Sequence, residues 1–395
     1  MAATDLLSRT LFAPRTSRAR ARCCAALVAL LMPALSWSAV LPDDRIDVLY
    51  HGYDGGGAQI DGPSVLVRKQ FANKVSVYAN YYVDMVSSAS IDVLATASEY
   101  TEERKEYSVG ADYLRDKTTI SASFTKSDES DYTAETMSFS ISQDFFGDLS
   151  TLTLGFSKGD DEVRNNADPD FKDTIDRRQY RIELSQILTR SWIVSLAAET
   201  VVDEGFLNNP YRSVRYLDAG SGTGYSYQQE IYPGTRNSDA FALRSKYFLP
   251  WRAALSAEFR HFSDSWGIEA FNGEISYLHP FKNGVTLELR YREYQQDAAD
   301  FYSDLFAFQN AQNFMARDKE LSTYTSTTYG LGASYEINLD KYKLWGDRIR
   351  FSLYWDHMEF RYDDFRNVLV GGTPGSEPLY SFDADVYRAF VSLWY

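Results

Sequence analysis

The amino-acid sequence predicts an all-β protein: a single antiparallel transmembrane β-barrel of about 16 strands, with short periplasmic turns and long external loops. Three observations predict this fold. Apolar and polar residues alternate with a period of two, short and long links alternate along the chain, and the chain ends on the alternating segment "DVYRAFVSLWY" (385 to 395). Only alternate side chains of a barrel strand face lipid, so such strands are weak in hydropathy.

The first 38 residues are expected to be a cleaved signal peptide, followed by the barrel at 39 to 395. Arginines precede an apolar run at 25 to 35, and the small residues of "SWSA" follow at 36 to 39. Basic region, short apolar region and small-residue cleavage site form the secretory pattern. Cys23 and Cys24 lie inside this segment, so the mature chain is expected to have no thiol chemistry and no disulfide. The alternative interpretation is an uncleaved membrane anchor.

The overall charge argues against nucleic acid as a partner. The chain carries a formal net charge of −15 at pH 7, with aromatic residues at 15% of the composition. Phosphate backbones are bound by basic surfaces. An exported, acidic, tyrosine-rich chain is instead typical of a soluble β protein or of an outer-membrane barrel.

Period-two alternation defines the individual strands. In residues 285 to 292, Val285 and Leu287 alternate with Thr286 and Glu288, and residues 349 to 356 have the same pattern. One face of each strand is therefore apolar, and the other face carries charge. The sequence predicts sixteen strands, beginning near residues 45, 63, 74, 104, 117, 132, 147, 176, 190, 236, 251, 266, 283, 324, 346 and 384.

The links between these strands sort by length. The links at one end are expected to be short, at 71 to 74, 114 to 118, 145 to 148, 188 to 191, 249 to 252, 279 to 284 and 338 to 347. The long links are expected at 87 to 103, 160 to 175, 202 to 235, 295 to 323 and 361 to 383. All the long links fall at the same end, as in outer-membrane barrels. In hydrocarbon the sheet must also close, because an open edge leaves backbone groups unpaired.

Charged residues of both signs are expected to point into the lumen. They either form a polar pathway that selects a solute or pair across neighbouring strands and keep the interior wet. The lumen-facing charges are Arg181, Glu183, Glu258, Arg260, Glu288, Arg290, Arg292, Glu336, Arg350, Asp356 and Arg388.

No catalytic or metal site is expected. Of the four histidines, His261 is near Ser263 and Asp264 in sequence, but adjacency in sequence does not bring a nucleophile, a base and an orienting group together. The acidic run from Asp160 to Asp176 has oxygen ligands suited to Ca²⁺, yet lacks the spacing of an EF-hand loop. We expect that run to be a solvated external loop.

Several blocks of sequence resemble the domain-of-unknown-function 3570 family. They are "GFLNNPYRSVRYLD" (205 to 218), "TRNSDAFALRSKYFLP" (235 to 250), "DSWGIEAFNGEISYLHPF" (264 to 281) and "RYREYQQDAADFY" (290 to 302), with "VDMVSSAS" (83 to 90) and "SDESDY" (127 to 132) nearer the start. The resemblance implies an outer-membrane barrel of unassigned activity. The family's frequent coding beside a small lipoprotein, a thioredoxin-like protein and a flavin-attaching enzyme implies a link to an envelope redox system.

If that link holds, residues of two external loops are candidates for a binding patch or constriction. The alternative is that they fasten one loop to the other across the barrel mouth. They are Tyr211, Arg212 and Arg215 in one loop, and Asp297, Asp300, Phe301 and Tyr302 in the other.

The last strand is expected to carry an assembly signal. Tyr387, Val391, Leu393 and Tyr395 fall on its lipid-facing side, and this alternation with a terminal aromatic residue resembles the signal recognised by the barrel assembly machinery. The same pattern suits an ordinary closing strand that ends at an aromatic girdle.

Three functions follow as hypotheses, all in the outer membrane of a Gram-negative-type bacterium, in contact with its lipid and lipopolysaccharide. The first is a porin-like channel or export conduit for a small polar solute, with no enzymatic activity and no cofactor. The second is a non-conducting barrel that docks a small lipoprotein or periplasmic redox protein. The third, an outer-membrane hydrolase, is the weakest because no catalytic constellation is evident.

Overall fold

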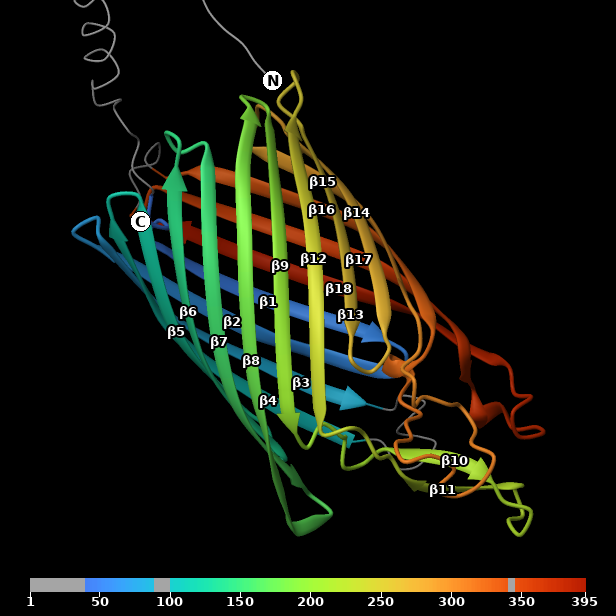
Figure 1. The fold of residues 1–395 in the computed structure, drawn as a ribbon. Coiled ribbons are helices and arrows are strands. Elements are labelled where there is room, and N and C mark those ends of the chain that lie inside the picture. Colours follow the sequence, from blue (N-terminus) through green and yellow to red (C-terminus); the bar gives the residue numbers. More distant parts are fainter. Residues whose placement is uncertain (1–39, 89–99, 340–344) are drawn as a thin grey trace, which may run out of the picture. The chain divides into compact units, whose positions relative to one another are not determined.

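The computed structural model describes residues 40–88, 100–339 and 345–395, so the expected signal peptide lies outside the described residues. The described chain forms a closed barrel of antiparallel strands (Figure 1). The barrel strands are β1 (Arg45–Gly55), β2 (Ala58–Phe71), β3 (Val75–Ser88), β4 (Tyr100–Arg115), β5 (Thr118–Asp128), β6 (Tyr132–Phe145), β7 (Ser150–Asn165), β8 (Asp168–Thr189), β9 (Trp192–Gly205), β12 (Thr235–Phe248), β13 (Ala254–Asp264), β14 (Glu269–Pro280), β15 (Val285–Gln296), β16 (Tyr324–Asn338), β17 (Arg348–Arg366) and β18 (Leu379–Trp394).

These sixteen strands confirm the predicted fold class. Each strand pairs with its neighbour along the chain, except that β9 pairs directly with β12, and β1 pairs with β18 to close the sheet. The closing register places Ile46 opposite Leu393 and Val48 opposite Val391. Closure leaves the sheet without an edge, which satisfies the backbone groups of every strand.

The two faces of the wall differ in chemistry as the alternation predicts. Apolar side chains project outward and are strongly exposed, for example Val109 (53%), Leu289 (55%) and Leu353 (65%). Side chains that point inward are polar and often buried against one another, among them Ser76 and Asp356. An apolar exterior around a polar interior is the arrangement of a barrel whose outer wall faces lipid.

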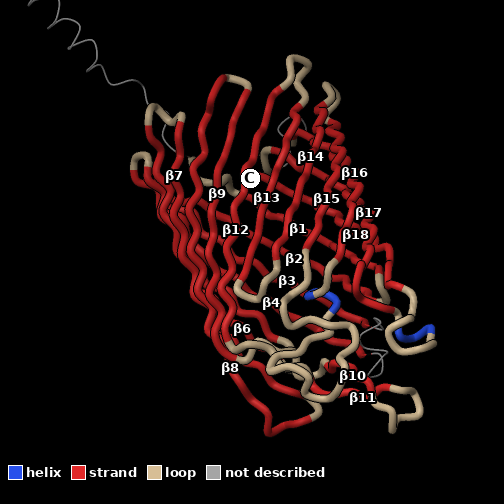
Figure 2. The backbone as a smooth tube through the Cα atoms, turned by 45° about the vertical axis from the view of Figure 1, so that its right-hand side comes forward, coloured by secondary structure: helices blue, strands red, loops and turns tan. Residues whose placement is uncertain are grey.

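The loops gather at one end of the barrel, which we call the lid end (Figure 2). A separate two-stranded sheet, β10 (Ser213–Leu217) with β11 (Tyr225–Gln229), lies there within the link between β9 and β12. Two short 3₁₀ helices, η1 (Lys319–Leu321) and η3 (Val368–Val370), lie in the links before β16 and β18. At the opposite end, which we call the turn end, the link between β2 and β3 is only residues 72–74.

Two of the predicted long loops are shorter than expected. Residues 160 to 175 are not a solvated loop, because β7 continues to Asn165 and β8 begins at Asp168. Ion pairs fasten this extended hairpin, for example Lys172 with Glu162 at 2.8 Å. Likewise β17 continues to Arg366 and β18 begins at Leu379. Charged residues occupy both faces of the β7–β8 extension, so it shows no period-two apolar pattern. The extension of β17 and β18 contains an aromatic cluster in which Tyr362 and Phe365 are buried, with Tyr380 and Phe382 packed against them.

Neither a metal cluster nor a spanning helix is evident in the described part of the chain. There, no group of three or more His, Cys, Asp or Glu side chains is arranged to hold a metal ion. Within the same residues, no helix has the length and apolar character needed to cross a membrane.

Candidate functional site: a cavity beneath a lid of loops

Three links at the lid end pack on one another and form what we call the lid. They are residues 206–234 between β9 and β12, 297–323 between β15 and β16, and 367–378 between β17 and β18. Backbone hydrogen bonds join the first two links: Met315 N–H donates to the Ile231 carbonyl at 2.8 Å, and Leu217 N–H donates to the Phe306 carbonyl at 2.9 Å. The lid is therefore a small folded unit and not a set of independent loops.

An aromatic core fixes the lid to the barrel wall. Tyr232 and Phe301 from two lid segments pack against Trp266 in the turn between β13 and β14, with ring centroids 5.2 to 5.5 Å apart. Leu321 and Ile268 are buried in the same cluster. Burial of such large side chains is the main stabilising term for a segment of this size.

A buried ion cluster joins all three lid segments. The fully buried guanidinium of Arg215 pairs with Asp304 and lies 2.5 Å from a Glu377 carboxylate oxygen. Arg317 pairs with Asp304 at 3.0 Å, and Arg366 Nη1 donates to the Glu377 carbonyl at 2.6 Å. Burial acts to lower the pKa of Arg215, but the two carboxylates outweigh it and raise that pKa. Arg215 and Arg317 offset the two buried carboxylates, and loss of one member would leave a buried charge without its partner.

Glu230 is a second buried ionisable group in the lid. Its carboxylate accepts hydrogen bonds from the Tyr232 hydroxyl at 2.6 Å and from the Arg317 backbone N–H at 2.7 Å. Burial, and then the negative charge of Asp318, raise the pKa of Glu230 to about 7, although these two hydrogen bonds act in the opposite direction. A lid that admits water around Glu230 would return this pKa towards about 4.5.

We therefore expect the lid to loosen as pH rises through 7. The pKa of Glu230 is higher when the lid is packed, so protonation of Glu230 stabilises the packed lid. This stabilisation is fully present below about pH 4.5, and up to about 3 kcal/mol of it is lost as the pH rises through 7. Hydrogen exchange of residues 225–232, corrected for its intrinsic pH dependence, should be faster at pH 8 than at pH 5. The variant Glu230→Gln keeps one acceptor oxygen and cannot ionise, so it should remove most of this difference. Equal protection at both pH values in the wild type would contradict the expectation.

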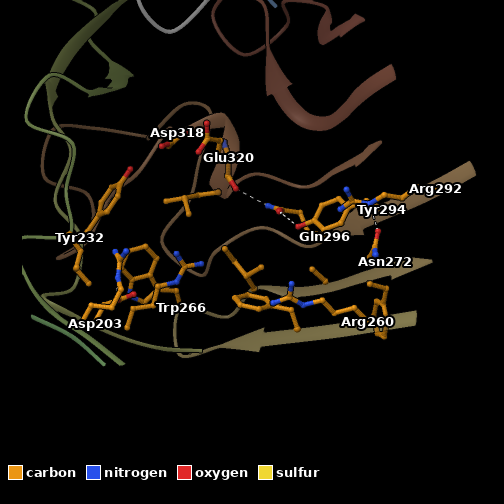
Figure 3. A pocket seen from close by; sticks show the side chains of 18 of the residues that line it. Asp203, Tyr232, Arg260, Trp266, Asn272, Arg292, Tyr294, Gln296, Asp318 and Glu320 are labelled. Carbon is orange, nitrogen blue, oxygen red and sulfur yellow. Dashed lines mark hydrogen bonds and ion pairs between the residues drawn. The ribbon is translucent and has the colours of Figure 1, made fainter. Parts of the chain in front are cut away.

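A cavity of about 690 Å³ lies directly beneath the lid, inside the barrel (Figure 3). Lid residues Tyr232, Asp318 and Glu320 form its roof. Inward-facing residues of β13 to β15 form one wall, including Arg260 and Arg292. The cavity is large enough for a small solute, and its polar walls are typical of a transport pathway.

Most charges around the cavity are paired. Arg177 lies 2.7 Å from Asp203, and Arg236 lies 2.6 Å from Asp264. Arg244, which lies outside the cavity lining, pairs at 2.6 Å with Glu258 of its wall.

Three charges of the cavity lining have no ion-pair partner within the described residues: Arg292, Glu274 and Glu320. Arg260 has a long ion pair, with Glu199 at 3.6 Å.

All the predicted lumen charges lie on the inner face of the barrel wall. The residues next to them along each strand lie on the outer face. Several form cross-strand pairs, for example Arg350 with Glu336 at 2.5 Å and Arg388 with Asp356 at 2.7 Å. Arg181 pairs with Glu183, Arg290 with Asp356 and Arg244 with Glu258. Glu288 lies on the inner face beside Gly332. Pairing therefore accounts for most of these charges, and the exceptions within the described residues are Glu288 and, in the cavity, Arg292.

The structure does not bring the candidate loop residues together as a surface patch. Arg215 is fully buried with Asp304 and Glu377, and Arg212 pairs with Asp318. Phe301 belongs to the aromatic core, and the Tyr302 hydroxyl donates to the Asp364 carbonyl at 3.3 Å. The Tyr211 hydroxyl accepts from the Asn166 backbone N–H at 2.8 Å. Asp297 and Asp300 are exposed, and their backbone N–H groups donate to the Glu269 and Trp266 carbonyls at 2.9 and 2.8 Å. Five of the seven residues thus fasten loops, which was the alternative interpretation.

The histidines are dispersed. His261 and Ser263 lie on the outer face, where His261 packs on Phe271, whereas Asp264 points inward to Arg236. His357 lies 3.0 Å from Asp385 on the outer face, and His279 lies 3.0 Å from Tyr277 at the end of β14. The three groups considered for a hydrolase therefore do not converge.

One polar cluster was not found from the sequence. His51 Nε2 lies 2.7 Å from Asp84 and 3.1 Å from the Tyr82 hydroxyl, and Arg104 lies 3.2 Å from the same Asp84. These residues come from β1, β3 and β4 and share the inner face. The alternation of Val48 and Tyr50 outward would have placed His51 inward, but no sequence spacing connects it with Asp84.

The last strand lies as its alternation predicts, with Tyr387 exposed on the outside and Arg388 inside. Val391 and Leu393 lie opposite Val48 and Ile46 of β1 in the register of the closing seam. The Tyr395 hydroxyl donates to the Arg68 carbonyl at 3.1 Å, and its ring stacks on Trp345 at 5.2 Å between centroids.

Several solved structures to which the chain is similar are outer-membrane proteins. The chain is similar to a bacterial polysaccharide outer membrane secretin, at 7% identity and a TM-score of 0.48, over 90% of this chain and 100% of the secretin chain. It is also similar to OpdK from Pseudomonas aeruginosa, at 11% identity and a TM-score of 0.42, over 89% and 98% of the two chains. A loop-deletion mutant of OmpT from Vibrio cholerae matches at 7% identity and a TM-score of 0.41, over 89% and 98%. These are likenesses of fold alone.

No curated protein matches the chain. A family model, in contrast, matches residues 95–181 and 165–358, which together span most of the barrel. The chain belongs to the family described as "Protein of unknown function (DUF3570)".

Proposed function

We propose that the chain is an outer-membrane channel through which a small polar solute passes, with the lid as its gate. The exposed apolar outer face, for example Ile275 (55%) and Leu353 (65%), supports a location in lipid. Charged inner walls support a wet lumen. The short turns of the turn end would then face the periplasm, and the lid would face the exterior.

The observation that carries this proposal is the cavity beneath the lid. It lies inside the barrel, has charged walls and is roofed by lid segments, which the Arg215 cluster joins to one another and the aromatic core around Trp266 joins to the wall. A rigid structural plug would be expected to fill the lumen with apolar packing. A roof held by a compact ion cluster above a charged cavity is better suited to opening and closing over a solute.

Flux measurements test the proposal. Purified protein in phospholipid liposomes should admit glycine and arabinose faster than protein-free liposomes do. Heat-denatured protein added at the same ratio serves as the control. Swelling rates equal to those of the control for every small solute would contradict a channel.

A second candidate is a non-conducting barrel that docks an envelope partner, such as a small lipoprotein or a redox protein. Exposed apolar side chains on the lid favour a partner that docks at that end, such as a lipoprotein at the cell surface; they are Phe308 (60%), Leu369 (51%) and Val370 (65%). This function predicts electrical silence together with a lipoprotein or flavoprotein that co-purifies with the barrel. A conducting barrel without such a partner would contradict it.

A further inference from the structure

We propose that the cavity beneath the lid binds a small organic monocarboxylate through Arg260 and Arg292. This inference rests on the proposed function, in that the solute must reach the lumen, and it names the chemical class of that solute. Both guanidiniums line the cavity. Arg292 has no ion-pair partner in the described residues, and Arg260 has only a long ion pair, with Glu199 at 3.6 Å.

The register of the wall places the two arginines on either side of one amide. Arg260 of β13 lies directly opposite Asn272 of β14, and Asn272 lies opposite Tyr294 of β15. Arg292, two residues before Tyr294, donates from Nε to Asn272 Oδ1. Figure 3 shows Arg260, Asn272 and Arg292 together at one side of the cavity. That hydrogen bond uses only one donor of Arg292, so its terminal nitrogens remain available for an anion.

Their ionic environment separates these arginines from the others in the cavity. Arg177 and Arg236 are neutralised by carboxylates at 2.7 and 2.6 Å. For Arg260 the nearest carboxylate is at 3.6 Å, beyond a normal charge-assisted hydrogen bond. Two neighbouring guanidiniums with free donors, in a partly enclosed site, form strong paired hydrogen bonds with a carboxylate.

The remaining lining restricts the ligand to a single negative charge. Glu274 lies directly opposite Arg292 on β14 and Glu320 lies in the roof, both without an ion-pair partner in the described part of the chain. Their charges repel a dianion. Phe262, Trp266 and Ile268 line the same cavity and offer apolar surface for the body of the ligand.

Calorimetry of the full barrel in detergent, with 3-phenylpropionate as the probe, tests this site. We expect saturable binding that weakens by at least about tenfold in Arg292→Gln and in Arg260→Gln. The control variant Arg350→Gln removes a lumen arginine that is paired with Glu336 and lies outside the cavity, and it should bind within about twofold of the wild type. Phenethylamine and phenyl phosphate should bind at least about tenfold more weakly than the monocarboxylate.

The outcomes separate this site from the channel function. Any one of three results would overturn the site: no binding to the wild type, an affinity for phenethylamine equal to that for 3-phenylpropionate, or an unchanged affinity in Arg292→Gln. Heat-modifiable mobility on gels shows that each variant is folded. Binding without any solute flux would contradict the channel and leave the site standing. Flux without binding would overturn the site alone.

Discussion

Replacing Arg215 with leucine is expected to unfasten the lid while leaving the barrel folded. The substitution removes the guanidinium that pairs with the buried carboxylate of Glu377, 3% exposed, and leaves Asp304, 9% exposed, with Arg317 as its counter-charge. Removing one partner of a buried ion cluster costs about 3–5 kcal/mol. That is comparable with the whole stability expected of a segment as small as the lid.

Hydrogen exchange resolves this effect by segment. In Arg215→Leu, protection should fall by about two orders of magnitude or more in residues 213–229 and 304–317, and stay unchanged in β5 and β6. The matched control is Arg361→Leu, whose side chain is 73% exposed and pairs with Glu359 at 2.9 Å. An exposed pair contributes about 0–1 kcal/mol, so this control should retain lid protection. Unchanged protection of the lid in Arg215→Leu would show that the ion cluster does not hold it.

Deleting Tyr395 is expected to reduce the yield of assembled barrel several-fold. The residue lies at the seam where β18 meets β1: its N–H donates to the Asp44 carbonyl at 3.3 Å, and its hydroxyl to the Arg68 carbonyl. Its ring also stacks on Trp345 and lies 4.7 Å from the Lys69 ammonium. The aromatic and cation–π contacts together contribute about 1–3 kcal/mol, in addition to any role as an assembly signal.

The fraction of heat-modifiable protein in isolated membranes measures this loss. Tyr180→Ala is the control, because Tyr180 is a tyrosine 50% exposed on the outer wall and away from the seam. That variant should assemble at nearly the wild-type level. A normal yield of heat-modifiable barrel from the chain that lacks Tyr395 would contradict both the contact argument and the signal.

The barrel could be predicted from the sequence because one physical constraint repeats along it. A wall with one apolar face imposes a period of two, and residues 285–292 of β15 and 349–356 of β17 show it without interruption. The prediction was wrong where that constraint ends. The hairpin of β7 and β8 beyond the apolar wall carries charge on both faces, and the strands β10 and β11 lie in the lid away from the wall.

The lid and the cavity depend on contacts that no spacing encodes. Arg215 is separated from Asp304 by 89 residues and from Glu377 by 162, so the ion cluster has no local signature. Arg292 was placed inward by alternation, and its direct neighbour Glu274 suggests an ordinary cross-strand pair. The guanidinium instead bonds diagonally to Asn272, and this choice of partner is made by side-chain packing that the sequence does not show.

Conductance through planar bilayers, for the wild type and for a chain with a trimmed lid, tests the central claim most directly. Replacing residues 206–234 by a short Gly/Ser turn is feasible, because Gly205 N–H already donates to the Gly234 carbonyl at 2.9 Å. If the lumen is a solute path and the lid its gate, the trimmed barrel should show discrete current steps larger than those of the wild type. Silent bilayers for both chains, with both barrels heat-modifiable and inserted, would contradict the account.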